Sequence, residues 1–405
     1  MKLAILLIVI LSGIYKLLLD VVRYRSASNP TPDNLSDVYD AETYEKWKKY
    51  SAECSRLDIV SDTVSFAVSF ALLAFNAYSA FASLFSSDVI VQLISVLLLE
   101  TAVGAAVSTV FSYVSTMKIE EKYGFNRTTT KTFIFDRIRS FLLDAALSLA
   151  LVCLLFALHS LIGDLMVILF ACVIFVFTII ISFLYPILSR VGNKFTPLED
   201  GELKDKLMEL LTKHGYSVKA IEVMDASRRT TKLNAYFTGF GKLKTIVLYD
   251  NLLNAMTPDE ITAVFAHELG HGLNKDVLKS QILNFANLFI MSVIVWLTVR
   301  EPAFHTAFGF AEVNYGFAYI LLGAILGIVQ PITMILMNAR SRKAEYRADR
   351  QAVKEGYGEP MISALKKLAR ENFAHLSPSP INVLMEYSHP PLGERIAAVE
   401  EEMKK

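Results

Sequence analysis

Long apolar windows are the feature that most constrains how this chain can fold. Each runs for roughly 20 residues with very little charge, the length that an α-helix needs to cross a hydrocarbon core of about 30 Å. The seven windows are Leu3–Val22, Ile59–Phe85, Val89–Ser115, Phe141–Leu161, Leu165–Leu188, Ile282–Val299 and Gly316–Met337. None has the polar stripe of a surface helix on a soluble domain. With 53% hydrophobic residues and a mean hydropathy of +0.41, the sequence predicts a polytopic membrane protein.

The first window could be mistaken for a secretory signal. Lys16, Asp20 and Arg23 bracket its end, and no small-residue cleavage site follows a short apolar core. We therefore expect an uncleaved membrane span.

Lys and Arg residues collect in alternate connections, which indicates the orientation. The basic connections are 23–58, 116–140, 190–280 and 338–405. The intervening connections are Ser86–Asp88, His159–Asp164 and Arg300–Tyr315. Their only Lys or Arg residue is Arg300. Because cytoplasmic loops carry the excess of positive residues, we expect the N-terminus outside and the C-terminus in the cytoplasm.

The predicted fold class is an all-α polytopic membrane protein of seven transmembrane helices with a small α+β cytoplasmic zinc-peptidase domain. We divide the chain into five spans with two basic loops (1–188), a cytoplasmic metallopeptidase segment (189–280), a transmembrane hairpin (281–337) and a C-terminal helical segment (338–405). The formal net charge is zero, which argues against a nucleic-acid partner. Cys54, Cys153 and Cys172 suggest neither a disulfide framework nor a cysteine-based zinc site.

Residues 201–274 combine a predicted helix, Leu203–His214, with strands at 220–223, 234–239 and 244–249. A second helix then begins with Thr257 as N-cap, Pro258 at its first position and Glu260 three residues after the cap. This helix carries the H-E-x-x-H pattern.

In that pattern, His267 and His271 stand four residues apart and so lie on one helix face. Both imidazoles can reach one metal ion while Glu268 meets a metal-bound water. The five-residue string also occurs by chance on surface helices, so it needs a third ligand to support a zinc site.

Glu345 is the predicted third ligand. It follows the last window on a helical stretch, and two predicted spans separate it from His271. Two spans return the chain to the side it left, which brings Glu345 back to the histidines. Asp349 lies one turn later, where it can accept a hydrogen bond from the free ring nitrogen of a zinc-bound histidine. The alternatives are a solvated surface acid for Glu345 and an intrahelical partner of nearby arginines for Asp349.

The set predicts amide hydrolysis with one zinc ion per chain, which polarises the substrate carbonyl and acidifies a water. Glu268 would take the proton from that water and pass it to the leaving amine, so it should not be a ligand.

The whole chain resembles the type I CAAX prenyl proteases. The resemblance rests on Pro32–Tyr50, Glu121–Arg127, Asn234–Tyr236, Ile246–Tyr249, the zinc motif, and Ser388–Pro391 followed by Glu394–Ile396. It implies seven helices around a water-filled intramembrane chamber, a peptide or protein substrate with a prenylated C-terminus, and a multi-pass location in the cell membrane or the endoplasmic reticulum membrane. It also implies that His389 steadies the oxyanion and that Asn234 holds the substrate backbone. The plain alternatives are a surface histidine and a turn asparagine.

Two other functions are compatible with parts of the sequence. A membrane quality-control protease would use the same chemistry, although such relatives usually have fewer spans. A receptor or transporter with a vestigial motif would be expected to lose Glu268 or a ligand, and every part is intact.

Overall fold

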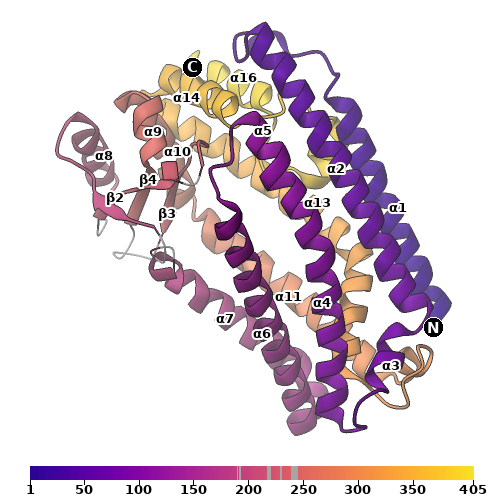
Figure 1. Cartoon of the computed structure of the whole chain (residues 1–405). Helices are drawn as coiled ribbons and strands as arrows, with labels where there is room; N and C mark the ends of the chain where they lie inside the picture. The colour runs from indigo at the N-terminus through magenta and orange to yellow at the C-terminus, as the bar shows by residue number, and fades with distance from the viewer. Residues whose placement is uncertain (189, 191–192, 217–219, 229, 239–244) are drawn as a thin grey trace.

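The computed structural model describes residues 1–188, 190, 193–216, 220–228, 230–238 and 245–405. Long helices form an elongated bundle, and a small sheet with several short helices lies at the end that holds the C-terminus (Figure 1). The bundle helices are α1 (Lys2–Ser26), α2 (Ala41–Ala74), α4 (Val89–Val114), α6 (Thr130–Ile162), α7 (Met166–Leu188), α11 (Asp276–Arg300) and α13 (Tyr315–Lys354).

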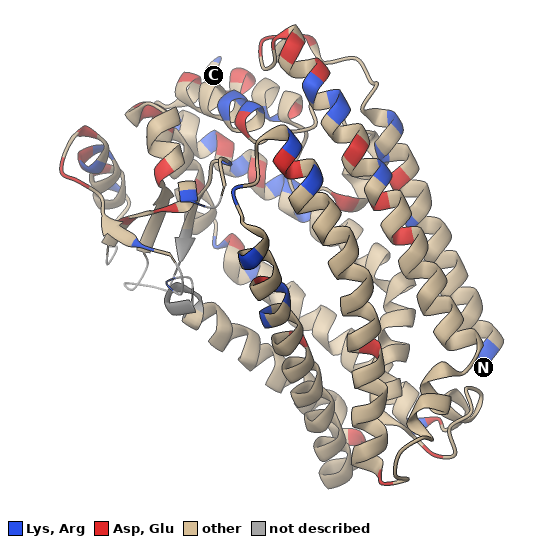
Figure 2. Ribbon diagram, viewed as in Figure 1, with Lys and Arg blue, Asp and Glu red and all other residues tan. Residues whose placement is uncertain are grey.

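The bundle confirms the polytopic membrane class. Among the described residues, six helical stretches are long and apolar enough to cross a membrane. One of them, Thr130–Ser182, contains α6 and most of α7, which meet at Gly163 with a φ of 55°. The count of seven spans therefore stays a prediction. Figure 2 shows that charged residues gather toward the end of the bundle that carries the sheet, whereas the opposite half is mostly uncharged.

The second window differs from its expected continuous helix. The structure ends α2 at Ala74, reverses at Asn76 with a φ of 53°, and begins the short helix α3 (Ala77–Ala82). Lys2 Nζ donates to the Ala74 carbonyl at 2.8 Å and to Asn76 Oδ1 at 2.7 Å. This side chain satisfies a terminal carbonyl of α2, which explains why the helix can stop inside an apolar run.

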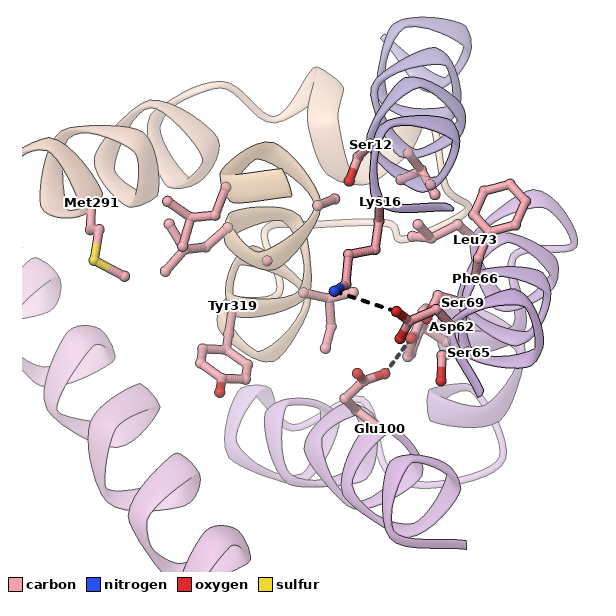
Figure 3. A pocket seen from close by; sticks show the side chains of 18 residues that line it. Ser12, Lys16, Asp62, Ser65, Phe66, Ser69, Leu73, Glu100, Met291 and Tyr319 are labelled. Carbon is pink, nitrogen blue, oxygen red and sulfur yellow. Dashed lines mark hydrogen bonds and ion pairs between the residues drawn. The ribbon is translucent and has the colours of Figure 1, made fainter. Parts of the chain in front are cut away.

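A cavity of about 510 Å³ lies within the bundle, lined by α1, α2, α3, α4, α11 and α13 (Figure 3). Its wall mixes apolar side chains with charged ones. Lys16 Nζ lies 3.5 Å from Asp62 Oδ2, and Tyr78 donates to Glu100. Ionisable groups among membrane helices normally face an interior or a water-filled space, as these do.

The sheet has four strands, β1 (Phe195–Pro197), β2 (Ala220–Met224), β3 (Ala235–Thr238) and β4 (Thr245–Tyr249), in the order β1-β2-β4-β3. β2 and β4 are parallel, and β3 pairs with β4 in the antiparallel direction. The strands predicted at 220–223, 234–239 and 244–249 are confirmed over their described residues, and residues 239–244, between β3 and β4, lie outside the described residues. In this sheet β3 is an edge strand.

Short helices surround the sheet: α8 (Glu202–Lys213), α9 (Asp250–Ala255), α10 (Pro258–Leu273), α14 (Gly358–Glu371), α15 (Pro380–Glu386) and α16 (Leu392–Met403). Their core contains Leu207, Leu248, Phe265, Leu365 and Ile396, and the first basic loop adds Leu35 and Trp47. The predicted cap of α10 is confirmed, because the Thr257 side chain accepts from Glu260 N and Glu260 Oε2 accepts from Thr257 N at 2.7 Å. α10 is thus fixed at its start and buried along its length.

Candidate metal centre

Helices α10 and α13 come into backbone contact where the H-E-x-x-H motif lies. A Cβ on Gly270 would stand 2.9 Å from the Ala348 Cα, closer than real Cβ atoms approach, so only glycine fits. Ala344, Ala348 and Ala352 keep the facing part of α13 small and buried. The contact places the two histidines of α10 opposite the carboxylates of α13.

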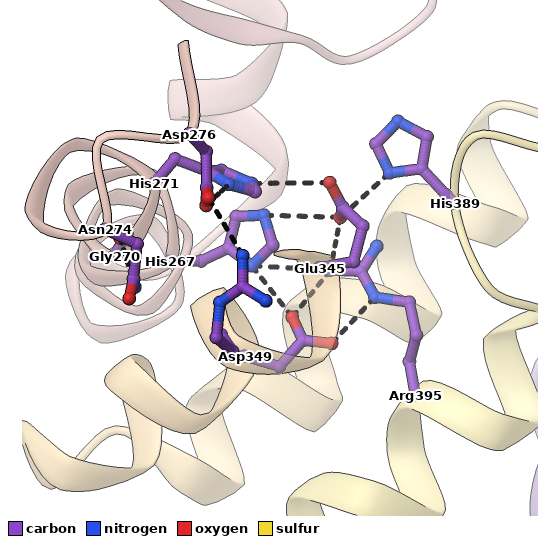
Figure 4. A network of polar contacts seen from close by, with 10 residues as sticks. His267, Gly270, His271, Asn274, Asp276, Glu345, Asp349, His389 and Arg395 are labelled. Atoms are coloured by element: carbon purple, nitrogen blue, oxygen red, sulfur yellow. Dashed lines mark hydrogen bonds and ion pairs between the residues drawn. The ribbon is translucent and has the colours of Figure 1, made fainter. Parts of the chain in front are cut away.

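Three ligand atoms converge at this contact (Figure 4). His267 Nε2 lies 3.5 Å from Glu345 Oε2, and His271 Nε2 lies 3.3 Å from Glu345 Oε1. One atom from each residue falls within 4.8 Å of the other two, a spacing that a single metal ion can bridge. His267 and Glu345 are buried, with 6% and 4% of their surface exposed. The structure therefore brings together the three residues predicted from the sequence.

The charge balance at these atoms favours a cation. Glu345 Oε2 is buried and, among the described residues, receives no hydrogen bond of good geometry, although His389 Nδ1 lies 2.8 Å away. Burial by itself lowers the pKa of His271, but its contacts with Glu345 and then Asp276 outweigh burial and raise that pKa to about 9. A buried carboxylate beside two imidazoles suits a metal ion.

Asp349 lies where the sequence placed it, one turn after Glu345. Its Oδ1 atom is 2.8 Å from His267 Nδ1, on the side of the ring that faces away from Glu345. Arg395 of α16 donates two hydrogen bonds to the same carboxylate, from Nε to Oδ2 at 2.9 Å and from Nη2 to Oδ1 at 2.6 Å. Asp349 is therefore no intrahelical partner of nearby arginines but a fully buried group held between a histidine and an arginine.

Sequence reasoning missed Asp276, which contacts His271, and Arg347, which contacts Asp276. Asp276, the first residue of α11, has Oδ2 3.2 Å from His271 Nδ1, and its Oδ1 accepts from Arg347 Nη2 at 2.8 Å. The one available signal was an acidic residue just beyond the end of the motif helix, in the turn that leads into the next span.

Glu268 lines a small cavity between α10 and the sheet. Ala235 and Tyr236 of β3 line the same cavity. Glu268 thus lies between the motif helix and the edge strand of the sheet.

His389 reaches the centre from the connection between α15 and α16. Its side chain is 62% exposed and lines a cleft of about 680 Å³ together with Tyr387, Asn372 and Arg395. The connection is anchored from α13, because Arg342 Nη1 donates to the carbonyls of Val383 and Tyr387 at 2.8 and 2.7 Å. The connection between α15 and α16 is therefore held against α13, the helix that bears Glu345.

Asn234 lies outside the polar network of Figure 4. It is exposed and immediately precedes β3, and its Oδ1 accepts from Ala235 N at 2.9 Å. Asn372 Oδ1 accepts from Leu233 N at 3.0 Å, which ties the entry of the edge strand to α14.

Comparison with known proteins agrees with this geometry over the whole chain. The family model described as Peptidase family M48 matches residues 197–403, and the model described as CAAX prenyl protease N-terminal, five membrane helices, matches residues 20–190.

Curated relatives include CAAX prenyl protease 1 of Saccharomyces cerevisiae, 31% identical over 91% of this chain and 88% of the relative. The CAAX prenyl protease 1 homolog of Arabidopsis thaliana is 31% identical over 97% of this chain and 96% of the relative. The crystal structure of S. mikatae Ste24p superposes with a TM-score of 0.91 at 29% identity, covering 98% of this chain and 99% of that one. Family match, fold and clustered ligand atoms agree, and the chain belongs to peptidase family M48 as a multi-pass membrane metalloendopeptidase.

Proposed function

We propose that one zinc ion is held by His267, His271 and Glu345. The supporting observation is the convergence of two imidazole nitrogens and one carboxylate oxygen within 4.8 Å, with Glu345 Oε2 buried and lacking a well-formed hydrogen bond. Two histidines and one glutamate are a known catalytic zinc ligand set, which leaves a fourth position for water or substrate.

A zinc ion at this position supplies Lewis-acid polarisation of the substrate carbonyl and a water whose pKa falls toward about 7. Glu268 accepts the proton from the attacking water and delivers it to the leaving amine. Its place supports this role, since Glu268 lines a small cavity together with Ala235 and Tyr236 of the edge strand β3.

Glu268→Ala and Glu345→Ala should separate proton transfer from metal binding. We expect Glu268→Ala to retain zinc and to lose proteolysis by about 10²- to 10⁴-fold, the usual contribution of a general acid–base group. Glu345→Ala should lose zinc itself. Elemental analysis of the purified variants measures their zinc content, and peptide cleavage rates measure their proteolysis. Equal zinc content in Glu345→Ala would remove it from the ligand set.

His389 and Asn234 act on the substrate in this proposal. The imidazole of His389, 2.8 Å from Glu345 Oε2 and open to the adjacent cleft, donates a hydrogen bond to the oxygen that gains negative charge during attack. Asn234 immediately precedes the edge strand β3, and the side of β3 that faces away from β4 can accept an extended peptide as an added strand.

The two variants should therefore affect different constants. His389→Ala is expected to lower kcat by roughly 10² to 10³, the cost of one oxyanion donor. Asn234→Ala should mainly raise KM, because it loses contact with bound peptide in ground and transition states alike. Steady-state kinetics of the two variants at matched zinc content distinguish a change in kcat from a change in KM. Normal turnover of His389→Ala would make this histidine a surface residue.

The substrate class that best fits the chain is a protein or peptide with a prenylated C-terminal CaaX sequence, from which the C-terminal tripeptide is removed. Support comes from similarity to CAAX prenyl proteases along the whole chain, membrane domain included. The cavity of about 510 Å³ among the membrane helices offers space for apolar and polar groups close to the bilayer.

Cleavage of matched peptides tests the substrate class. A farnesylated CaaX peptide should be cut at the bond after the modified cysteine with a kcat/KM at least tenfold above that of the same peptide without the prenyl group. Equal rates for the two peptides, together with cleavage of an unfolded membrane protein, would instead support a quality-control protease.

We also propose that the metal centre and the C-terminus face the cytoplasm, in the cell membrane of a prokaryote or the endoplasmic reticulum membrane of a eukaryote. The charge distribution supports this, because basic residues gather at the end of the bundle that carries the sheet (Figure 2). Single cysteines at Lys46 and Lys131 should react with an impermeant thiol reagent from the cytoplasmic side, and cysteines at Asp88 and Arg300 from the other. Labelling of Lys131 and Asp88 positions from one side would contradict this orientation.

A further inference from the structure

We propose that Asp276 is a positioning residue for His271 and that Arg347 holds it in place. The inference rests on the proposed function, because it takes His271 to be a metal ligand. In this role Asp276 makes the first turn of α11, a candidate membrane helix, part of the metal centre.

The two motif histidines are held in parallel ways (Figure 4). His267 turns Nε2 toward Glu345 and places Nδ1 2.8 Å from Asp349 Oδ1. His271 turns Nε2 toward Glu345 and places Nδ1 3.2 Å from Asp276 Oδ2. In each ring the carboxylate accepts the Nδ1 proton, which fixes the tautomer whose Nε2 lone pair is free for the metal.

Each of these carboxylates also has its own arginine. Arg395 contacts both oxygens of Asp349, and Arg347 Nη2 donates to Asp276 Oδ1 at 2.8 Å. Asp276 is only 8% exposed, and a buried carboxylate is costly unless it has hydrogen-bonding partners of this kind. With one oxygen on Arg347 and the other on His271, the side chain of Asp276 is held from two directions.

The backbone before Asp276 takes an unusual conformation that aims it at His271. α10 ends at Leu273, and Lys275 has a φ of 54°, a left-handed conformation that residues with a side chain seldom adopt. The Asn274 side chain donates to the Gly270 carbonyl at 2.8 Å and closes the end of α10. This turn starts α11 within reach of the motif, and the helix N-terminus adds a favourable field for the Asp276 carboxylate.

A purely structural role would be that Asp276 and Arg347 only join the start of α11 to α13. The two roles predict different measurements. A structural ion pair affects the stability of the fold, whereas a positioning residue affects how tightly His271 binds the metal.

Zinc affinity of the full-length protein in detergent, measured by competition with a chromophoric chelator, tests the inference. Asp276→Ala should bind zinc about 10- to 100-fold more weakly than the parent, the range found when a partner of a metal-bound histidine is removed. Asp276→Asn should fall between them, since its amide oxygen still accepts the Nδ1 proton. Arg347→Gln should weaken binding less than Asp276→Ala, and the double variant should bind no more weakly than Asp276→Ala alone.

Arg350→Gln is the matched control, because Arg350 lies one turn further along α13, is exposed, and bonds only the Tyr346 carbonyl among described hydrogen bonds. It should leave zinc affinity unchanged. Thermal unfolding of the metal-free variants provides the second readout. If Asp276→Ala binds zinc as tightly as the parent and only its unfolding temperature falls, the role is structural and this inference is wrong. If the parent itself binds no zinc, the proposed function fails instead.

Discussion

Backbone contact between α10 and α13 sets the spacing between the two motif histidines and the carboxylates of Glu345 and Asp349. Gly270 permits the approach, since a Cβ there would lie 2.9 Å from the Ala348 Cα. The contact places two histidines from one helix against Glu345 and Asp349 from the other, all of them largely removed from water. In such surroundings each charge needs a fixed partner: Arg395 of α16 contacts Asp349, and His389, from the connection between α15 and α16, lies beside Glu345.

Two of the candidate membrane helices themselves carry residues of the metal centre. α13 carries the last candidate span and, beyond it, Glu345 and Asp349, while α11 begins with Asp276. The chain leaves the motif helix α10 along α11 and returns to it along α13. Arg342 then holds the connection that bears His389. The metal centre therefore sits where the bundle meets the sheet domain, next to the bilayer from which a lipid-modified substrate would come.

The large features were predictable because local patterns encode them. Apolar length predicted the membrane class, Thr257 and Glu260 predicted the start of α10, and the return of two spans predicted that Glu345 meets His271. The chain reversal at Asn76 and the partners of the two histidines were not predictable. Arg395 reaches Asp349 from a different helix, and Asp276 depends on a left-handed residue at Lys275, so neither leaves a periodic trace in the sequence.

X-ray absorption at the zinc edge of the purified full-length protein identifies the atoms around the metal without the need for a substrate. We expect about one zinc per chain with two imidazole nitrogens and oxygen ligands, all at roughly 2.0 to 2.2 Å. Sulfur ligands, a single imidazole, or protein that takes up no zinc when it is supplied would contradict a centre built from His267, His271 and Glu345.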